Sequence, residues 1–182
     1  TSQNYAWSLD SSNPGAKNTF VRDAFCRDLP RETGRPYTRT RYYHLYLNGQ
    51  YWGLYETQER SEASYAETYF GGEADDYDVI MTDGYQTSYT DGTIDEWNLL
   101  WALCQEGFAS DKQYYAVQGK NADGTDNPSL PVRVDVGNLA DYMIGIFYTG
   151  NDDAPVTLGG GQANNFFAIR NRVVESRQGW QF

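Results

Sequence analysis

The chain has 182 residues, a length that fits one domain with a hydrophobic core of useful size. Its formal net charge of −11 argues against nucleic acids and anionic membrane surfaces as partners, because such a field repels both. No apolar run approaches the roughly 20 residues of a membrane-spanning helix. Residues 1–20 have neither the basic start nor the apolar core of a signal peptide, so we expect no signal peptide in this chain.

The first predicted elements are a short strand and a helix. Residues 5–10, YAWSLD, are typical of a short strand. From Thr19 to Leu29 the apolar residues recur at helical spacing, which predicts a helix. Pro30 is expected to limit that helix, because proline disfavours helical backbone in the residue before it.

A β-hairpin is the clearest local pattern in the chain. Two alternating, aromatic-rich arms at 42–47 and 51–57 flank the dipeptide Asn48-Gly49. This dipeptide favours a type I′ turn, in which both central residues take positive φ and the backbone twist matches that of paired strands. The sequence therefore predicts two antiparallel strands joined by a two-residue turn.

The later part of the chain is predicted to be mainly helical. In chain order, the elements are a helix ending at Gly71-Gly72, a short strand from Asp76, amphipathic helices over 93–107 and 135–149, a glycine-rich loop, the strand-like FFAIRNR and a final arm, GWQF. The apolar face of the 93–107 helix is expected to consist of Ile94, Trp97, Leu100, Trp101 and Cys104.

Cys26 and Cys104 are the two cysteines, and they form no C-x-x-C motif. Two buried free thiols are the first interpretation, and a single disulfide is the alternative. A zinc site is not expected, since the chain has one histidine and the two cysteines are far apart in sequence.

The hairpin resembles a signature of the CotH (spore-coat protein H) kinase family, R-x-x-x-L-Y-L-N-G-x-Y-W-G-x-Y-x-x-x-E. Members of that family look like atypical, secreted relatives of protein kinases. The matching residues are Arg41, Leu45, Tyr46, Leu47, Asn48, Gly49, Tyr51, Trp52, Gly53, Tyr55 and Glu59. The resemblance implies an α+β, protein-kinase-like fold for residues 1–182. A partial small β lobe of helix plus hairpin, with its hinge, would span 1–59, and a mainly helical lobe with a late β-hairpin would span 60–182.

A second segment is similar to the same family, whose pattern there is approximately G-N-T-D-W … N-N-W-Y-A-x-R-N-R … W-x-F. The matching residues are Gly150, Asn151, Asp153, Asn164, Asn165, Ala168, Arg170, Asn171, Arg172, Trp180 and Phe182. The chain departs from the pattern at Asp152, where the family has threonine, and at Ala154, where it has an aromatic residue. Asp153 and Asn165 lie twelve positions apart, which suggests an inserted glycine-rich stretch.

This resemblance implies where phosphoryl transfer would take place. Kinases need a carboxylate that orients the nucleophilic hydroxyl and oxygen ligands that hold magnesium against the phosphates. Asp153 is expected to be the catalytic carboxylate, Asn165 with Asn164 the metal ligands, and Asn151 and Asp152 second-tier site residues. Taken without the family, the Asn-Asp-Asp run has a simpler explanation, since such residues cap and solvate a turn after a helix.

Gln58 and Glu59 fall where a kinase hinge would follow its second hairpin strand. Backbone groups at these two positions are therefore expected to meet the adenine edge of ATP. The alternative is that Glu59 pairs with Arg60 or Arg41 at the end of a strand.

The expected function is that of an ATP- and magnesium-dependent protein kinase. It would phosphorylate hydroxyl groups of an exported or surface protein, outside a bacterial cell or at its surface. No glycine-rich phosphate loop precedes a strand, and the chain stops before the family's W-D, so we expect the rest of the same polypeptide to complete the fold. The alternative is a non-catalytic extracellular module that binds a glycan or a protein partner through its aromatic residues.

Overall fold

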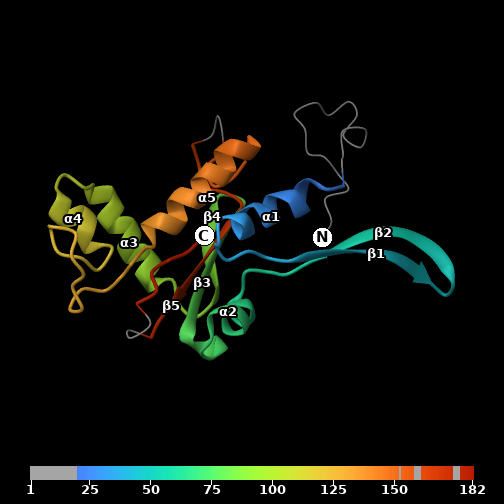
Figure 1. Cartoon of the computed structure of the whole chain (residues 1–182), viewed down its shortest axis with the longest axis horizontal. Helices are drawn as coiled ribbons and strands as arrows, with labels where there is room; N and C mark the ends of the chain where they lie inside the picture. The colour runs from blue at the N-terminus through green and yellow to red at the C-terminus, as the bar shows by residue number, and fades with distance from the viewer. Residues whose placement is uncertain (1–19, 152, 158–160, 174–176) are drawn as a thin grey trace. The chain divides into compact units, whose positions relative to one another are not determined.

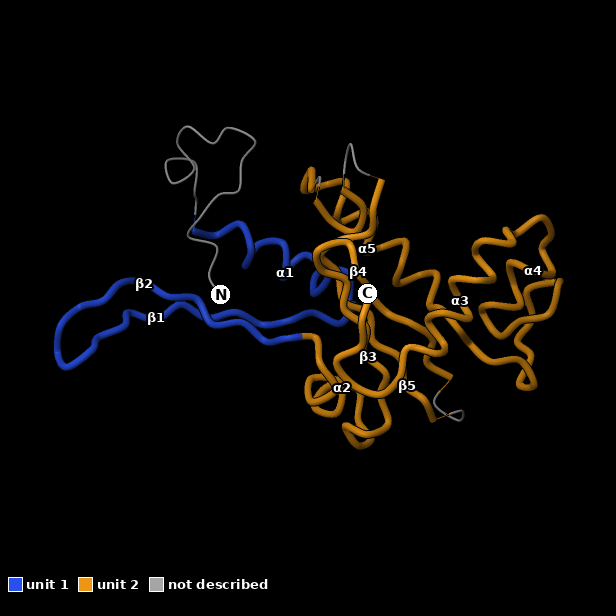
Figure 2. Tube along the Cα trace, turned by 180° about the vertical axis from the view of Figure 1, so that it is seen from behind, with its two compact units in different colours: residues 1–60 blue, residues 61–182 orange. Residues whose placement is uncertain are grey.

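A computed structural model describes residues 20–151, 153–157, 161–173 and 177–182 (Figure 1). The strand predicted at 5–10 and the site residue Asp152 lie outside the described residues. The chain divides into two compact units, residues 1–60 and residues 61–182 (Figure 2). That these units correspond to the two lobes of a kinase remains a prediction.

Unit 1 contains the helix α1 (Arg22–Glu32) and the antiparallel strands β1 (Thr40–Leu47) and β2 (Gln50–Gln58). The helix continues for two residues past Pro30. Pro30 has no N–H to donate to the helix, but its carbonyl accepts hydrogen bonds from the backbone N–H of Thr33 at 3.1 Å and of Arg35 at 2.9 Å where the helix ends.

The predicted hairpin is confirmed. Asn48 and Gly49 have φ of 51° and 79°, the pair of positive values that a type I′ turn requires. The register shifts between Leu45 and Tyr46, opposite Gly53, whose φ is 139°. A bulge of this kind increases the local twist of the strands. Most hairpin side chains are exposed, and among the described residues of unit 1 Glu56 alone is buried.

Unit 2 contains a three-stranded antiparallel sheet and four α-helices among its described residues. In chain order its elements are α2 (Ala63–Phe70), a short 3-10 helix (Ala74–Asp76), β3 (Tyr77–Asp83), β4 (Gln86–Asp91), α3 (Asp95–Glu106), α4 (Asp111–Ala116), α5 (Val136–Thr149) and β5 (Phe166–Asn171). The strand order is β4-β3-β5, so β3 is central. The sequence analysis predicts all of these except the 3-10 helix, β4 and α4.

Two hydrophobic clusters cover the two faces of the central strand β3. Tyr77 and Val79 pack with Ala63, Tyr65, Ala66 and Ile169 on one face, whereas Ile80 packs with Leu100, Val117, Val134, Phe166, Ala168 and Trp180 on the other. Successive side chains of a strand point to opposite faces, so a strand that is covered on both sides has a continuous apolar run. The sequence D-V-I-M in β3 follows this pattern apart from its one acidic residue.

The apolar face of α3 differs from the expected one. Trp97, Leu100 and Leu103 contribute to the core, but Trp101 is 55% exposed and Cys104 is exposed. The core residues are spaced three apart along the helix. The buried face therefore includes Leu103 and leaves out the predicted Trp101 and Cys104. Cys26 and Cys104 are both free thiols, as first interpreted, but neither is fully buried.

The final arm anchors the larger of the two cores. Trp180 is fully buried, and its ring lies 5.5 Å from that of Trp97 in an edge-to-face arrangement. Ile169 of β5 and Gln181 exchange two backbone hydrogen bonds of 2.9 Å, so the expected late hairpin forms through a single antiparallel bridge. No helix in the described part of the chain is long and apolar enough to cross a membrane.

Candidate active site and hinge

The helix α5 positions the candidate active site at its carboxyl end. The side chain of Asp135 accepts a hydrogen bond from the backbone N–H of Asn138 at 2.9 Å and caps the start of the helix. At the other end Gly150 takes a left-handed φ of 63°, and the backbone N–H of Asn151 donates to Ile146 at 3.1 Å. These bonds fix the direction in which the chain leaves α5.

The side chain of Asn151 forms the turn that carries Asp153. Its Oδ1 accepts hydrogen bonds from the backbone N–H of Asp153 at 3.0 Å and of Ala154 at 3.3 Å. An asparagine side chain that bonds the backbone two residues later forms an Asx-turn. The predicted second-tier residue Asn151 therefore positions the backbone of Asp153, which is also the turn-capping role that the alternative assigns to this run.

A closed loop returns the chain from Asp153 to Asn164. The backbone N–H of Thr157 donates to Gln162 at 3.0 Å, that of Gly161 donates to Thr157 at 3.0 Å, and that of Asn164 donates to Pro155 at 2.9 Å. These bonds bring the two ends of the glycine-rich stretch together. The twelve-residue separation in sequence therefore does not separate Asp153 from the asparagines in space.

Asp153, Asn164 and Asn165 form one cluster, which we call the Asp153 cluster. The Nδ2 of Asn164 donates to Oδ1 of Asp153 at 3.1 Å, and the Nδ2 of Asn165 donates to Oδ2 at 2.5 Å. Asn165 has a left-handed φ of 52°, a conformation that asparagine tolerates better than most residues. This backbone turns Asn165 toward the aspartate immediately before β5 begins at Phe166.

The Asp153 cluster supplies ligands of the kind that magnesium accepts. Magnesium prefers oxygen ligands and usually keeps several waters together with phosphate oxygens. Asn164 is buried, and its Oδ1 has no hydrogen-bond partner in the described structure, so this oxygen is an unsatisfied acceptor inside the cluster. The described residues contain no group of three or more His, Cys, Asp or Glu side chains that could hold a metal ion. The cluster therefore fits one part of a magnesium site and would need phosphate, water or a further carboxylate to complete it.

Gln58 and Glu59 have partners within unit 1. The Oε1 of Gln58 accepts from Nη2 of Arg27 at 3.1 Å, and Oε2 of Glu59 accepts from the backbone N–H of Arg39 at 2.8 Å. Glu59 also forms an ion pair with Arg39, in which Nη1 lies 3.4 Å from Oε2. The backbone N–H of Glu59 donates to Arg39 at 3.1 Å, so an adenine edge would have to use other backbone groups.

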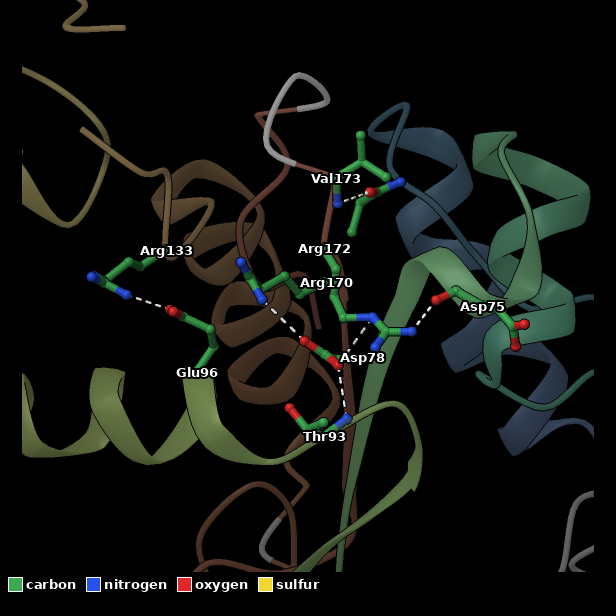
Figure 3. A network of polar contacts seen from close by, with 9 residues as sticks. Asp75, Asp78, Thr93, Glu96, Arg133, Arg170, Arg172 and Val173 are labelled. Atoms are coloured by element: carbon green, nitrogen blue, oxygen red, sulfur yellow. Dashed lines mark hydrogen bonds and ion pairs between the residues drawn. The ribbon is translucent and has the colours of Figure 1, made fainter. Parts of the chain in front are cut away.

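A buried ionic network lies beside the sheet, and the sequence analysis does not predict it (Figure 3). Asp78 of β3 is 1% exposed, and its Oδ2 accepts from Nη1 of Arg170 at 3.0 Å. Its Oδ1 accepts from the backbone N–H of Thr93 at 2.8 Å and lies 3.5 Å from Nε of Arg172. Arg172 also contacts the backbone carbonyl of Asp75.

The network joins β3, the turn before α3, and β5, so it fixes the strand that follows Asn165. Two sequence signals could have revealed it. Asp78 is the one acidic residue within a buried apolar run, and two arginines follow the apolar half of FFAIRNR. An acid in such a run requires a buried partner of opposite charge.

Comparison with curated proteins and comparison with solved structures each find no match. A family model described as CotH kinase protein matches residues 6–168, which include the hairpin and the whole Asp153 cluster. Because this match spans most of its length, the chain belongs to the CotH kinase family.

Proposed function

We propose that the chain is part of an ATP- and magnesium-dependent protein kinase of the CotH type. Its acceptors would be hydroxyl groups of an exported or surface protein of a bacterium. The observation that supports this proposal is the Asp153 cluster, in which one exposed carboxylate receives hydrogen bonds from the side-chain amides of Asn164 and Asn165. Family membership gives this constellation its kinase interpretation.

In this proposal the two asparagines hold the carboxylate of Asp153 in a fixed orientation, in which it would accept a hydrogen bond from the acceptor hydroxyl and take its proton. Such orientation is the main protein contribution to phosphoryl transfer, together with electrostatic stabilisation. The amide oxygens of Asn164 and Asn165 would hold magnesium, which neutralises charge on the phosphates when it is bound. Backbone groups near Gln58 and Glu59 would contact the adenine.

The test is phosphate transfer from γ-labelled ATP by the polypeptide that carries this chain. We expect Asp153→Ala and Asp153→Asn each to lower the rate by about 100-fold or more, the contribution typical of a positioned acid or base. Asp83→Ala is the control, because Asp83 is an exposed aspartate at the end of β3. Asn165→Ala should raise the magnesium concentration that gives half-maximal rate. Undiminished transfer by both Asp153 variants would contradict the assigned role.

A second function is favoured by the exposed aromatic residues of the hairpin. Tyr43, Tyr46, Tyr51, Trp52 and Tyr55 are all exposed. Aromatic side chains that lie in solvent on a strand pair can stack on sugars or anchor a protein interface. Calorimetric titration with magnesium-ATP and with a panel of glycans separates the two functions. Glycan binding without nucleotide binding would support a non-catalytic module.

A further inference from the structure

Glu56 is an exceptional residue of unit 1. Its side chain on β2 is 8% exposed, and it is the one buried residue among those that the structure describes in this unit. Its Oε1 has no hydrogen-bond partner. A buried carboxylate oxygen without a partner is costly when ionised, since it has lost its hydration and has gained no donor in return.

The charges around Glu56 compensate it only in part. On α1, Asp23 adds a second negative charge that acts on Glu56. The Oδ2 of Asp23 accepts hydrogen bonds from Nε of Arg27 at 2.8 Å and from Nε2 of Gln58. Arg27 also donates to Gln58 and contacts Thr38, so its charge is shared. On β1, Tyr42 lies directly opposite Glu56 in the strand register, and its hydroxyl contacts the carbonyl of Phe20.

The pKa of Glu56 is raised above its ordinary value, chiefly by burial and then by the negative charge of Asp23. The side-chain hydrogen bond of Gln58 and the charge of Arg27 act in the opposite direction. The pKa of Tyr42 is also raised, first by burial and then by Glu56 and Asp23, so the tyrosine hydroxyl stays neutral and supplies no compensating charge change.

We propose that Glu56 is a proton-binding site between α1 and the β1-β2 hairpin, and that release of this proton weakens the packing of α1 on the hairpin. A proton fits the site better than a metal ion, because the described residues offer no third carboxylate, histidine or cysteine beside Glu56 and Asp23. Once ionised, the buried carboxylate of Glu56 would repel that of Asp23 with little screening by water. Separation of the helix from the strands would relieve that repulsion.

The direction of the pH effect follows from the raised pKa. Below the ordinary pKa of glutamate the side chain is protonated whether α1 is packed or not, and the packing has its full stability. Between the ordinary and the raised value the packed state alone keeps the proton, so stability falls as the pH rises. Above the raised value this contribution is lost. The packing of α1 on the hairpin is therefore sensitive to pH and is more stable at acidic pH.

The experiment is a pH titration of the whole chain by NMR, with two readouts. The side-chain carboxyl ¹³C signal of Glu56 should titrate above the ordinary midpoint of glutamate, about 4.3. The hydrogen-exchange protection factors of the α1 amides should fall through the same pH window. Each unit by which the midpoint is raised predicts about a tenfold fall in protection.

Glu56→Gln keeps the shape and polarity of the protonated acid, so its α1 protection should be independent of pH in that window. Glu32→Gln is the matched control, because Glu32 is an exposed glutamate at the end of α1, and it should behave as the unaltered chain does. A Glu56 midpoint at the ordinary value would overturn the proposal. So would the same pH dependence in Glu56→Gln, or a midpoint that added Mg²⁺ lowers. The wild-type titration needs no variant and no kinase activity.

Discussion

Asp78 in unit 2 and Glu56 in unit 1 are both buried carboxylates on β-strands, but their partners differ. Asp78 receives hydrogen bonds from Arg170 and from the backbone N–H of Thr93, and Arg172 lies close to it. Glu56 has one oxygen without a partner and a second acid, Asp23, nearby. The first carboxylate is buried beside two arginines and a backbone donor, whereas the second is buried most easily as a neutral acid.

This difference teaches how one fold can use the same chemical group in two ways. A fully paired carboxylate joins three segments of unit 2 and gives the sheet a fixed register. An incompletely paired carboxylate makes the contact between α1 and the hairpin responsive to pH. Three changes to the chain test the comparison, and they are given from the largest expected effect to the smallest.

Asp78→Ala should have the largest effect. The substitution leaves Arg170 largely buried without its counter-charge, and breaking one partner of a buried ion pair destabilises a protein by about 3–5 kcal/mol. Urea unfolding of the variant and of the unaltered chain measures this difference in the free energy of unfolding. The exposed Asp83 of the same strand gives the control, since Asp83→Ala should change stability by less than about 0.5 kcal/mol. If both substitutions lower the free energy of unfolding equally, the ion pairs of Asp78 add no stability of their own.

Gly92→Ala should have an intermediate effect. Gly92 has φ of 67°, and a Cβ placed there would lie 2.2 Å from Oδ1 of Asp78 and 2.6 Å from the carbonyl oxygen of Tyr77. The added methyl group must displace the carboxylate from its donors, in addition to a backbone strain of about 1–2 kcal/mol.

Gly84→Ala is the matched control for this substitution. Gly84 also has positive φ, at 56°, but a Cβ there would meet nothing within 4 Å. The two variants share the backbone strain, so the difference between their melting temperatures isolates the contact with Asp78. If both variants melt at the same temperature, the carboxylate has room to move and the comparison with Glu56 loses its basis.

Glu56→Gln should have the smallest effect, and one that depends on pH. Because the raised pKa of Glu56 removes stability from the unaltered chain as the pH rises above the ordinary value of glutamate, about 4.3, the variant should become more stable relative to that chain from about pH 4 to pH 7. Urea unfolding at both pH values, followed by circular dichroism, measures the change. A relative stability that is constant with pH would mean that Glu56 is solvated when α1 is packed.

The parts of the fold that the sequence predicts have local causes. The Asn48-Gly49 turn and the helix predicted over 135–149 each depend on residues within a few positions of one another. Such elements can be predicted from sequence because the residues that favour them and the backbone groups that they bond are neighbours in the chain. The convergence of Asp153 and Asn165 also rests on short-range bonds within one loop, and the family pattern suggested it.

The parts that the sequence analysis misses depend on distant partners. The strand β4, QTSYTD, is polar and mostly exposed, and pairing with β3 holds it in place. The ion pair of Asp78 with Arg170 joins residues 92 positions apart, and no periodicity signals such a pair. Trp101 shows the same limit, since the side of α3 that is buried depends on where Trp180 and Phe166 lie.

The closed base of the loop between Asp153 and Asn164 has a consequence for how this region varies. The hydrogen bonds from Thr157 to Gln162 and from Asn164 to Pro155 join the two sides of the loop close to Asp153 and Asn164. Residues added between Thr157 and Gln162 would lengthen the loop without moving the aspartate away from the asparagines. Each doubling of a flexible loop costs only about 0.6 kcal/mol of closure entropy. The stretch is therefore a natural point for inserting a tag or a reporter next to the Asp153 cluster while its geometry is retained.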